Sequence, residues 1–192
     1  MNNEIILVDI FDRETGYTDK EDAHKKGLLH RAFSVFVING GRMLIQKRNR
    51  NKYHSGGLWT NACCSHPRKG ETLEQAVERR MREELGFSSE AKELFSFVYR
   101  HEFTDGLVEY EFDHVFLTDY DGEYELNTEE AEEAKWIGFE ELAEDLRVEP
   151  QKYTVWFQIA APKVLAYANS LGTDWFYSFC QTNYCITADA VV

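Results

Sequence analysis

The chain has 192 residues, of which 43% are hydrophobic and 14% aromatic, and its formal net charge is −13. This length and apolar content predict one folded domain and exclude a largely disordered chain, and the acidic balance argues against broad binding to nucleic acid or membranes. No apolar run reaches the ~18 residues of a membrane helix and no signal peptide is recognisable, so we expect a cytoplasmic protein with reduced cysteines.

Hydrophobic periodicity and turn residues predict a succession of strands and helices. In chain order we expect a strand over 5–9, a turn over 12–16, a helix over 20–26, strands over 30–38 and 42–48, a loop over 49–57 and a strand over 58–64. These are followed by a helix over 72–85, strands over 95–102 and 107–118, a short strand over 135–137 and helices over 139–146 and 153–168.

This mixture of elements predicts an α+β (α/β/α) fold, in which helices flank a mixed β-sheet. We expect one domain over residues 1–170. The periodic pattern fades in residues 171–192, yet this C-terminal tail carries Trp175, Phe176, Tyr177 and Phe179. Such apolar content is unusual for a solvated segment, so we expect the tail to dock, without a defined role.

Charge is distributed unevenly along the chain. Five basic residues and no acidic one lie between Arg42 and Lys52, whereas twelve acids accompany only Lys135 between Asp119 and Asp145. A basic patch on an acidic protein is compatible with a small anionic ligand. Composition alone favours the simpler interpretation, a solvated hairpin edge.

The helix expected over 72–85 carries two charged residues within its apolar stripe. At about 100° per residue, Arg80 and Glu84 fall among Leu73, Ala76, Val77, Met81 and Leu85. A charge that points inward must be paired or must bind something. Two interpretations remain open, a buried Arg80–Glu84 ion pair, or a pocket in which Glu84 binds a metal and Arg80 an anion.

Two strands carry further polar side chains. In the strand over 107–118, alternation places Glu109, Glu111 and Asp113 on one face, which indicates either a solvated face or a metal or acid–base site. In the segment 59–67, Cys64 and His66 share a face, whereas Cys63 points to the other side. A lone histidine is usually structural, but three histidines (His24, His30 and His66) with two carboxylates would suit Mn²⁺, Mg²⁺ or Zn²⁺.

Residues 65–87 resemble the Nudix box, with Glu71, Arg79 and the run Glu83-Glu84-x-Gly86-Phe87. The chain departs from the box at Ser65, where glycine is expected, and at Arg80, where a metal-binding glutamate is expected. Together with Leu29-His-Arg-Ala-Phe-Ser-Val-Phe36 and Trp59-Thr-Asn-Ala-Cys-Cys-Ser-His-Pro67, this degenerate box resembles the type 1 isopentenyl-diphosphate isomerases of the Nudix superfamily, over residues 20–156. The resemblance implies a Nudix fold and isomerisation of isopentenyl diphosphate to dimethylallyl diphosphate.

The resemblance also implies roles for individual residues. Cys64 and Glu111 would be the acid–base pair, with Tyr99 hydrogen-bonded to the carboxylate and Trp156 facing the hydrocarbon. The remaining residues would bind metal or diphosphate: His24, His30, His66, Glu109 and Glu111 a first divalent ion (Mn²⁺, Mg²⁺ or Zn²⁺), Glu84 a Mg²⁺ that arrives with the diphosphate, and Lys20, Arg48, Lys52 and Arg80 the phosphates.

This chemistry needs a dry pocket, because the reaction passes through a tertiary carbocation that water would trap. The expected partner is a small prenyl diphosphate, and we expect a monomer or weak dimer that binds neither nucleic acid nor membrane. Alternatives are a Nudix pyrophosphohydrolase of a nucleoside diphosphate derivative, or a metal-bound module without turnover. A further alternative keeps the isomerase fold but assigns the reactive thiol to Cys63, with Cys64 as a structural residue.

Overall fold

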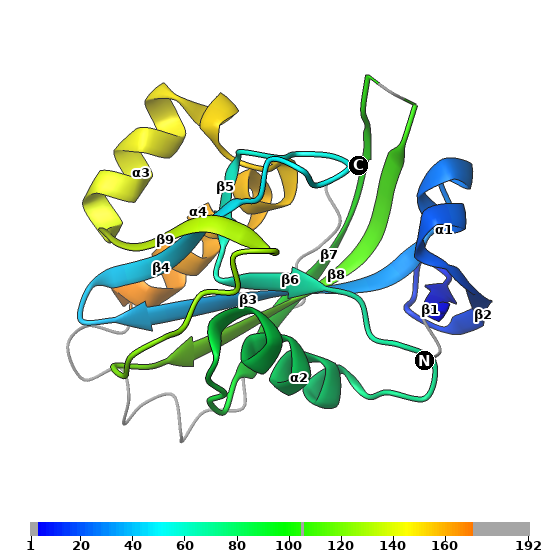
Figure 1. Cartoon of the computed structure of the whole chain (residues 1–192), viewed down its shortest axis with the longest axis horizontal. Coiled ribbons are helices and arrows are strands. Elements are labelled where there is room, and N and C mark those ends of the chain that lie inside the picture. The colour runs from blue at the N-terminus through cyan, green and yellow to red at the C-terminus, as the bar shows by residue number, and fades with distance from the viewer. Residues whose placement is uncertain (1–3, 105, 171–192) are drawn as a thin grey trace.

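The computed structural model of the chain describes residues 4–104 and 106–170. In this part of the chain, nine strands form one mixed sheet (Figure 1). The strands are β1 (Glu4–Val8), β2 (Glu14–Asp19), β3 (His30–Asn39), β4 (Arg42–Arg48), β5 (Trp59–Asn61), β6 (Cys63–Ser65), β7 (Lys92–Glu102), β8 (Val108–Asp119) and β9 (Ala131–Gly138). The helices are α1 (Lys20–Lys26), α2 (Leu73–Leu85), α3 (Phe139–Val148) and α4 (Val155–Ser170), with a short 3₁₀ turn, Pro150–Lys152, before α4.

Strand β3 lies at the centre of the sheet and pairs with several neighbours. It runs antiparallel to β1, β4 and β6 and parallel to β8, while β7 continues the sheet beyond β8. Its sequence, from Arg31 to Ile38 almost entirely apolar or small, matches burial on both faces. The parallel register sets His30 opposite Glu111, and the β6 register sets Ser34 opposite Cys64.

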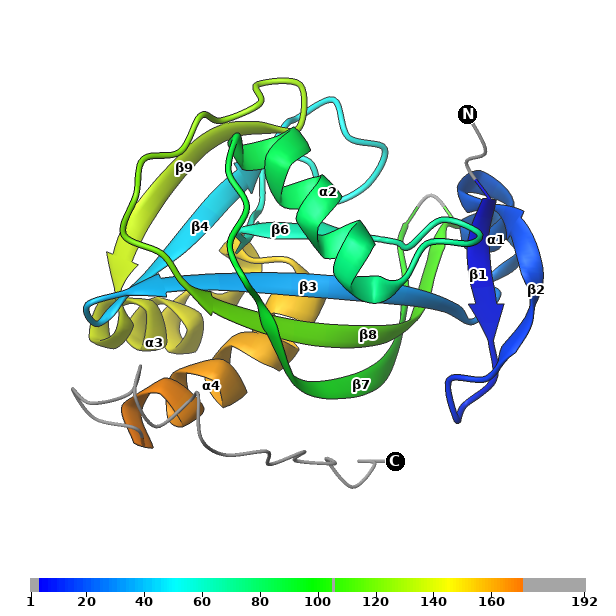
Figure 2. The same cartoon turned by 90° about the horizontal axis from the view of Figure 1, so that it is seen from below.

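Helices cover both faces of the sheet, so the molecule has two apolar cores. Helix α2 packs on one face and α4, with α3 beside it, on the other (Figure 2). Alternate side chains of β3 serve the two cores: Val35 and Val37 pack toward α2, whereas Phe36 stacks on Phe157 of α4 at 5.7 Å between ring centroids. Full burial of an aromatic side chain of this kind stabilises the fold by about 2–3 kcal/mol.

The ends of α1 and α2 follow from local sequence. Helix α1 stops at Gly27, which adopts φ 59°, and α2 stops at Gly86, which adopts φ 73°. Both are left-handed conformations that glycine adopts at little cost. Helix α2 begins with a capping box, in which the Thr72 side chain accepts from the Gln75 backbone and the Gln75 side chain accepts from the Thr72 backbone.

The sequence-based assignment of elements was wrong at several edges of the sheet. The segment expected as a turn leads into β2, a largely exposed edge strand without an apolar face. The single strand expected over 58–64 is two short strands, because β5 pairs with β4 and β6 pairs with β3. Strand β9 is longer than the expected 135–137, since its exposed glutamates hid the alternation. Strand β7 likewise begins three residues before the expected Phe95.

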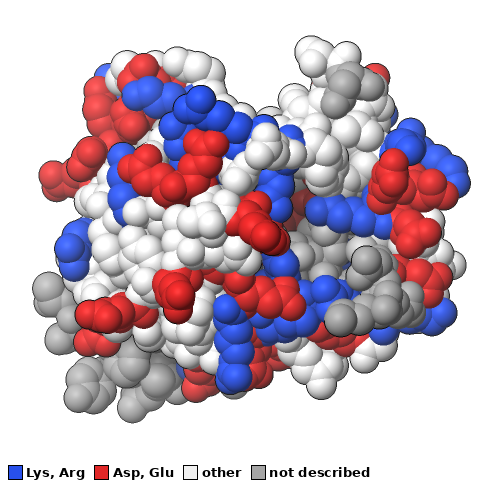
Figure 3. All heavy atoms as spheres, in the orientation of Figure 1, with Lys and Arg blue, Asp and Glu red and all other residues white. Residues whose placement is uncertain are grey.

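The site lies in a hollow between the β7–β8 hairpin and the loop that joins β4 to β5. The space-filling view shows this hollow on the face of Figure 1, with Lys and Arg side chains along its wall (Figure 3). Within the described residues, no helix combines the length and the apolar content that crossing a membrane requires. The tail 171–192, with Cys180 and Cys185, lies outside the described residues, so its docking and the domain boundary stay predictions.

Candidate active site

Three neighbouring strands bring His30, Glu111 and Tyr99 to the same level of the sheet. Glu111 on β8 is paired with His30 on β3 and with Tyr99 on β7. Because cross-strand partners project from the same face, their side chains meet. The Tyr99 hydroxyl donates to Glu111 Oε2 at 2.6 Å, and His66 Nε2 lies 2.8 Å from Glu111 Oε1.

Five side chains that are far apart in sequence converge into one buried cluster. Each offers a ligand atom, and all five atoms lie within 4.8 Å of one another: His24, His30, His66, Glu109 and Glu111. The three imidazoles meet through their Nε2 atoms, at 3.3 Å between His24 and His30 and 3.2 Å between His30 and His66. All five residues predicted for the first metal are therefore in one place, and we call them the His/Glu cluster.

The electrostatics of the His/Glu cluster fit a divalent cation. Burial lowers the pKa of His24 to about 2 and that of His66 well below its usual value, so both keep free lone pairs. The pKa of His30 is raised, because Glu111 outweighs the opposing effect of burial. Burial would raise the pKa of Glu111, but hydrogen bonds from His30 and Tyr99, among others, outweigh this effect and lower the pKa to about 2. His24 and His66 are therefore neutral imidazoles beside an ionised Glu111, and this N/O donor set is one that Mn²⁺, Mg²⁺ and Zn²⁺ accept.

A small cavity of about 40 Å³ opens beside the His/Glu cluster. Cys64, Glu111, Tyr99 and Trp156 all line it, and so do Lys20 and Arg48. Burial raises the pKa of the Cys64 thiol to about 12, although Arg48 acts in the opposite direction. A thiol in this environment is protonated at neutral pH rather than a standing thiolate.

Trp156 and Arg48 form one wall of this cavity. The Trp156 indole Nε1–H donates to Asn61 Oδ1 at 3.2 Å, which fixes the ring, and only 4% of the residue is exposed. The Arg48 guanidinium lies 5.3 Å from the centre of the Trp156 ring and 3.9 Å, through Nη1, from Cys64 Sγ. The flat ring face and the thiol are therefore neighbours of the same cationic side chain.

A second cavity of about 200 Å³ adjoins the first and is strongly charged. It contains Lys20, Arg48, Lys52 and Arg80 together with the carboxylates Glu84 and Glu130. Lys20 lines both cavities, and burial lowers the pKa of its amine. All four basic residues predicted to bind phosphate are thus gathered around one space, next to the cavity that holds Cys64.

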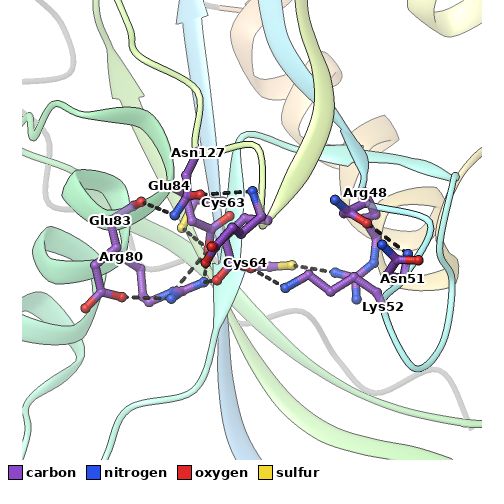
Figure 4. A network of polar contacts seen from close by, with 12 residues as sticks. Arg48, Asn51, Lys52, Cys63, Cys64, Arg80, Glu83, Glu84 and Asn127 are labelled. Carbon is purple, nitrogen blue, oxygen red and sulfur yellow. Dashed lines mark hydrogen bonds and ion pairs between the residues drawn. The ribbon is translucent and has the colours of Figure 1, made fainter.

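Arg80 and Glu84 form a buried ion pair and also line a cavity, so features of both sequence-based interpretations are present. Arg80 Nη2 lies 2.6 Å from Glu84 Oε1, so the buried ion pair exists, and Arg80 also contacts Glu83 at 2.7 Å (Figure 4). Both residues nevertheless line the second cavity. Glu84 is 3% exposed and also accepts from Gln46 Nε2 at 2.9 Å.

The two adjacent cysteines occupy different environments, as strand alternation predicted. Cys63 is fully buried against α2, and its thiol lies 3.4 Å from Glu84 Oε1. Cys64 faces the first cavity with His66. Of the basic run between Arg42 and Lys52, Arg48 and Lys52 line the second cavity, whereas Arg42 packs over Trp136.

Sequence reasoning missed several residues of the site, among them Tyr53, His54 and Glu130. Tyr53 and Glu130 line the second cavity and His54 the first. Glu130 pairs with Lys52 and, at 3.1 Å, with Arg80. None carried a periodic signal, since Tyr53 and His54 lie in a loop and Glu130 stands among many acids.

Comparison with known proteins agrees with this geometry. Residues 28–157 match the NUDIX domain family. Among solved structures, the chain is similar to a protein from Deinococcus radiodurans (TM-score 0.62, 21% identity, 76% of this chain and 90% of that one) and to the MutT protein from Methanosarcina mazei Go1 (TM-score 0.58, 19% identity, 73% and 95%). At these identities the likeness concerns the fold alone, whereas the family match over residues 28–157 defines a protein of the Nudix class.

Curated relatives narrow this class. The chain is 47% identical to Isopentenyl-diphosphate Delta-isomerase 2 of Aromatoleum aromaticum over 167 residues, 86% of this chain and 88% of that protein. It is 47% identical to the enzyme of the same name from Photorhabdus laumondii, over 82% of this chain and 90% of that protein. The chain belongs to the isopentenyl-diphosphate Delta-isomerase family.

Proposed function

We propose that this chain converts isopentenyl diphosphate to dimethylallyl diphosphate, by adding a proton at the terminal alkene carbon and removing one from the methylene on the other side. Family membership supports this reaction, with relatives of this name 44–47% identical over most of the chain. The observation that carries it is the pairing of a thiol and a carboxylate, Cys64 and Glu111, in one cavity beside a basic one.

Cys64 and Glu111 would move the two protons. Both line the same cavity, so each reaches a flat five-carbon unit held there. Tyr99 donates to Glu111 Oε2 and so fixes the direction of that carboxylate. Proton balance is kept because one group gives a proton to the substrate while the other takes one from it.

Trp156 would stabilise the intermediate cation through the face of its ring. The quadrupole of an indole attracts a cation by about 2 kcal/mol when water is excluded. The ring is 4% exposed and held by Asn61. An aromatic wall also keeps water away from a carbocation that water would otherwise trap.

The His/Glu cluster would hold one divalent ion. Its N/O donors are compatible with Mn²⁺, Mg²⁺ or Zn²⁺. When bound, the ion would tune the proton affinity of Glu111 and fix its orientation. Glu84 would bind a Mg²⁺ that arrives with the diphosphate, while Lys20, Arg48, Lys52 and Arg80 contact the phosphate oxygens. These contacts lie away from the reacting carbons and therefore supply orientation.

Product analysis in deuterated water tests this proposal. Isopentenyl diphosphate with Mg²⁺ should give dimethylallyl diphosphate that carries deuterium in a methyl group, which NMR detects. Inorganic phosphate should remain at background, and nucleoside diphosphates should be unchanged. Steady phosphate release without deuterium in the carbon skeleton would identify a hydrolase instead, and intact binding of prenyl diphosphate without turnover would identify a non-catalytic module.

The proposed setting of the enzyme follows from composition. A net charge of −13 is unfavourable for nucleic acid or anionic membranes, and the partner we propose is a small prenyl diphosphate. That it acts in the cytoplasm as a monomer or weak dimer remains a prediction from the sequence, which a fractionation and a light-scattering measurement test.

A further inference from the structure

The loop between β4 and β5 places two consecutive side chains against the His/Glu cluster from outside. The Tyr53 hydroxyl and His24 Nδ1 share a hydrogen bond of 2.8 Å. His54 Nε2 lies 2.6 Å from Glu109 Oε1, and its side chain is 3% exposed. His54 is not among the five residues whose ligand atoms converge, so it contacts a ligand rather than joining the set.

The contact from Tyr53 decides which nitrogen of His24 faces the cluster. His30 offers a comparison, because its Nδ1–H donates to the Leu28 carbonyl at 2.8 Å, so that in the neutral ring the lone pair is on Nε2 and faces inward. When the His24 Nδ1–H donates to the Tyr53 oxygen, the Nε2 lone pair points toward His30 and Glu109 in the same way. A histidine whose outer nitrogen is bonded in this manner is a better-oriented metal ligand.

His54 lies against Glu109 on the outer side of the cluster, where its Nε2 closely approaches Glu109 Oε1 without the geometry of a hydrogen bond. The His54 ring stacks on Phe103 at 4.6 Å between centroids and stands edge-on to Trp156 at 6.1 Å. These contacts hold the ring so that Nε2 stays beside the carboxylate. Glu109 therefore has a polar neighbour on its outer side, at the carboxylate oxygen Oε1.

The backbone of the loop that carries Tyr53 and His54 is constrained at both of its ends. A Cβ atom on Gly56 would come 2.6 Å from the Arg50 carbonyl oxygen, so only glycine fits, and Gly57 has a φ of 78°. The loop is closed by hydrogen bonds from Lys52 N to Asn49 O at 3.1 Å and from Gly57 N to Arg48 O at 3.0 Å. Preorganisation of this kind lowers the entropic cost of holding ligands in place.

We infer that Tyr53 and His54 are positioning residues for the divalent ion of the His/Glu cluster, Tyr53 through His24 and His54 through Glu109. The inference rests on the proposed function, because it presupposes that the cluster binds an ion. It makes the β4–β5 loop part of the metal centre, although the loop contributes no ligand. Lys52, the residue before Tyr53, belongs to the diphosphate cavity, so one short segment supports both halves of the site.

Cobalt titration of metal-stripped protein tests this inference without any turnover. The dissociation constant for Co²⁺, read from its visible absorption, should rise by about 10–100-fold in Tyr53→Phe and in His54→Phe. The second change keeps an aromatic ring against Phe103, so a role in packing alone would leave the affinity unchanged. His54→Gln, which restores an amide donor near Glu109, should recover most of the affinity.

Tyr17→Phe is the matched control, because the Tyr17 hydroxyl also bonds a side chain, Glu14, but on the exposed edge strand β2. This variant should bind Co²⁺ like the parent. In turnover assays His54→Phe should lose kcat with little change in KM, since His54 lines the first cavity and not the second.

The outcomes separate two failures. A parent protein that binds no Co²⁺ would overturn the metal centre, and this inference with it. A parent that binds Co²⁺ tightly, with Tyr53→Phe and His54→Phe equal to it, would overturn the inference alone and leave the proposed reaction untouched.

Discussion

The environment of a strand residue in this protein depends on which face of the sheet its side chain occupies. Cys63 and Cys64 are neighbours in sequence, yet one is sealed against α2 beside Glu84 and the other lines the cavity that holds Glu111. Burial raises the pKa of both thiols, so acidity does not distinguish them. Location does, because only Cys64 can reach a substrate in the first cavity.

We therefore expect Cys64→Ala to lower kcat by about 10²–10⁴-fold, since it removes a proton-transfer group, while substrate still binds through the second cavity. Cys63→Ala should retain activity and lose about 1 kcal/mol of stability to the small void that it leaves. Steady-state kinetics with urea unfolding measures both. An inactive Cys63→Ala beside an active Cys64→Ala would reverse the assignment.

Helix α2 shows how an element combines structure and site. Arg80 and Glu84 interrupt its apolar stripe, and they form a buried pair that also faces the second cavity. A buried carboxylate that loses its cation keeps its desolvation cost without compensation. The helix therefore needs Arg80 even before any substrate binds.

Arg80→Gln should destabilise the fold by about 2–4 kcal/mol and raise KM, because Glu84 is left buried without its cation. The double variant Arg80→Gln/Glu84→Gln should regain much of the stability but not the substrate affinity. Urea unfolding of the complete mutant cycle, with KM for each variant, measures the coupling. Arg82→Gln, whose exposed partner is Glu78, is the control and should change stability by less than about 1 kcal/mol. Equal stability of the single and double Arg80 variants would contradict the prediction.

Strand β8 is tied to the β1–β2 turn through a histidine on its opposite face. His114 Nδ1 lies 2.7 Å from Glu93 Oε1 and its Nε2 lies 3.1 Å from Asp12 Oδ2, while Arg31 holds the other Asp12 oxygen at 2.8 Å. Burial opposes the charge of His114, but the two carboxylates outweigh it and raise its pKa to about 9.

The pKa of His114 is higher in the folded state than the unfolded value of 6.5, so protonated His114 stabilises the fold. This stabilisation is fully present below about pH 6.5 and is lost as the pH rises through about 9. We expect a loss of about 1–2 kcal/mol, less than the shift alone implies, since the carboxylates are partly exposed. Urea unfolding at pH 6 and pH 9.5 measures it, and His114→Gln should remove the difference. A parent and a variant with the same pH dependence would refute the assignment.

At the scale of the whole molecule, the His/Glu cluster joins α1, β3, β8 and the segment after β6. Its five members are spread from His24 to Glu111 in the sequence, so the cluster exists only in the folded chain. An ion that binds the folded state alone stabilises it by mass action.

We expect one divalent ion per chain to survive dialysis and to raise the melting temperature, by the equivalent of about 3 kcal/mol at a concentration 100 times its Kd. His66→Ala should lose the ion, whereas His114→Gln, a histidine outside the cluster, should retain it. Metal analysis with thermal unfolding measures both. A fully active protein without metal would contradict this prediction.

Local sequence patterns determined which residues share a face and which elements form. Alternation put Glu109 and Glu111 on one face of β8 and Cys64 beside His66, because side-chain direction in a strand has a fixed period of two. Periodicity in α2 isolated Arg80 and Glu84, and glycine signals located the ends of α1 and α2. The family resemblance then turned these separate groups into one expected site.

Only the tertiary structure decided which of these groups meet. The parallel register of β3 and β8 sets His30 opposite Glu111. Packing of both sheet faces fixes that register, and the local sequence of either strand does not predict it. The edge strands β2 and β9 were missed or shortened because an exposed edge needs no apolar alternation. Tyr53, His54 and Glu130 entered the site by contact across the fold, since a loop has no periodicity that could reveal where its side chains point.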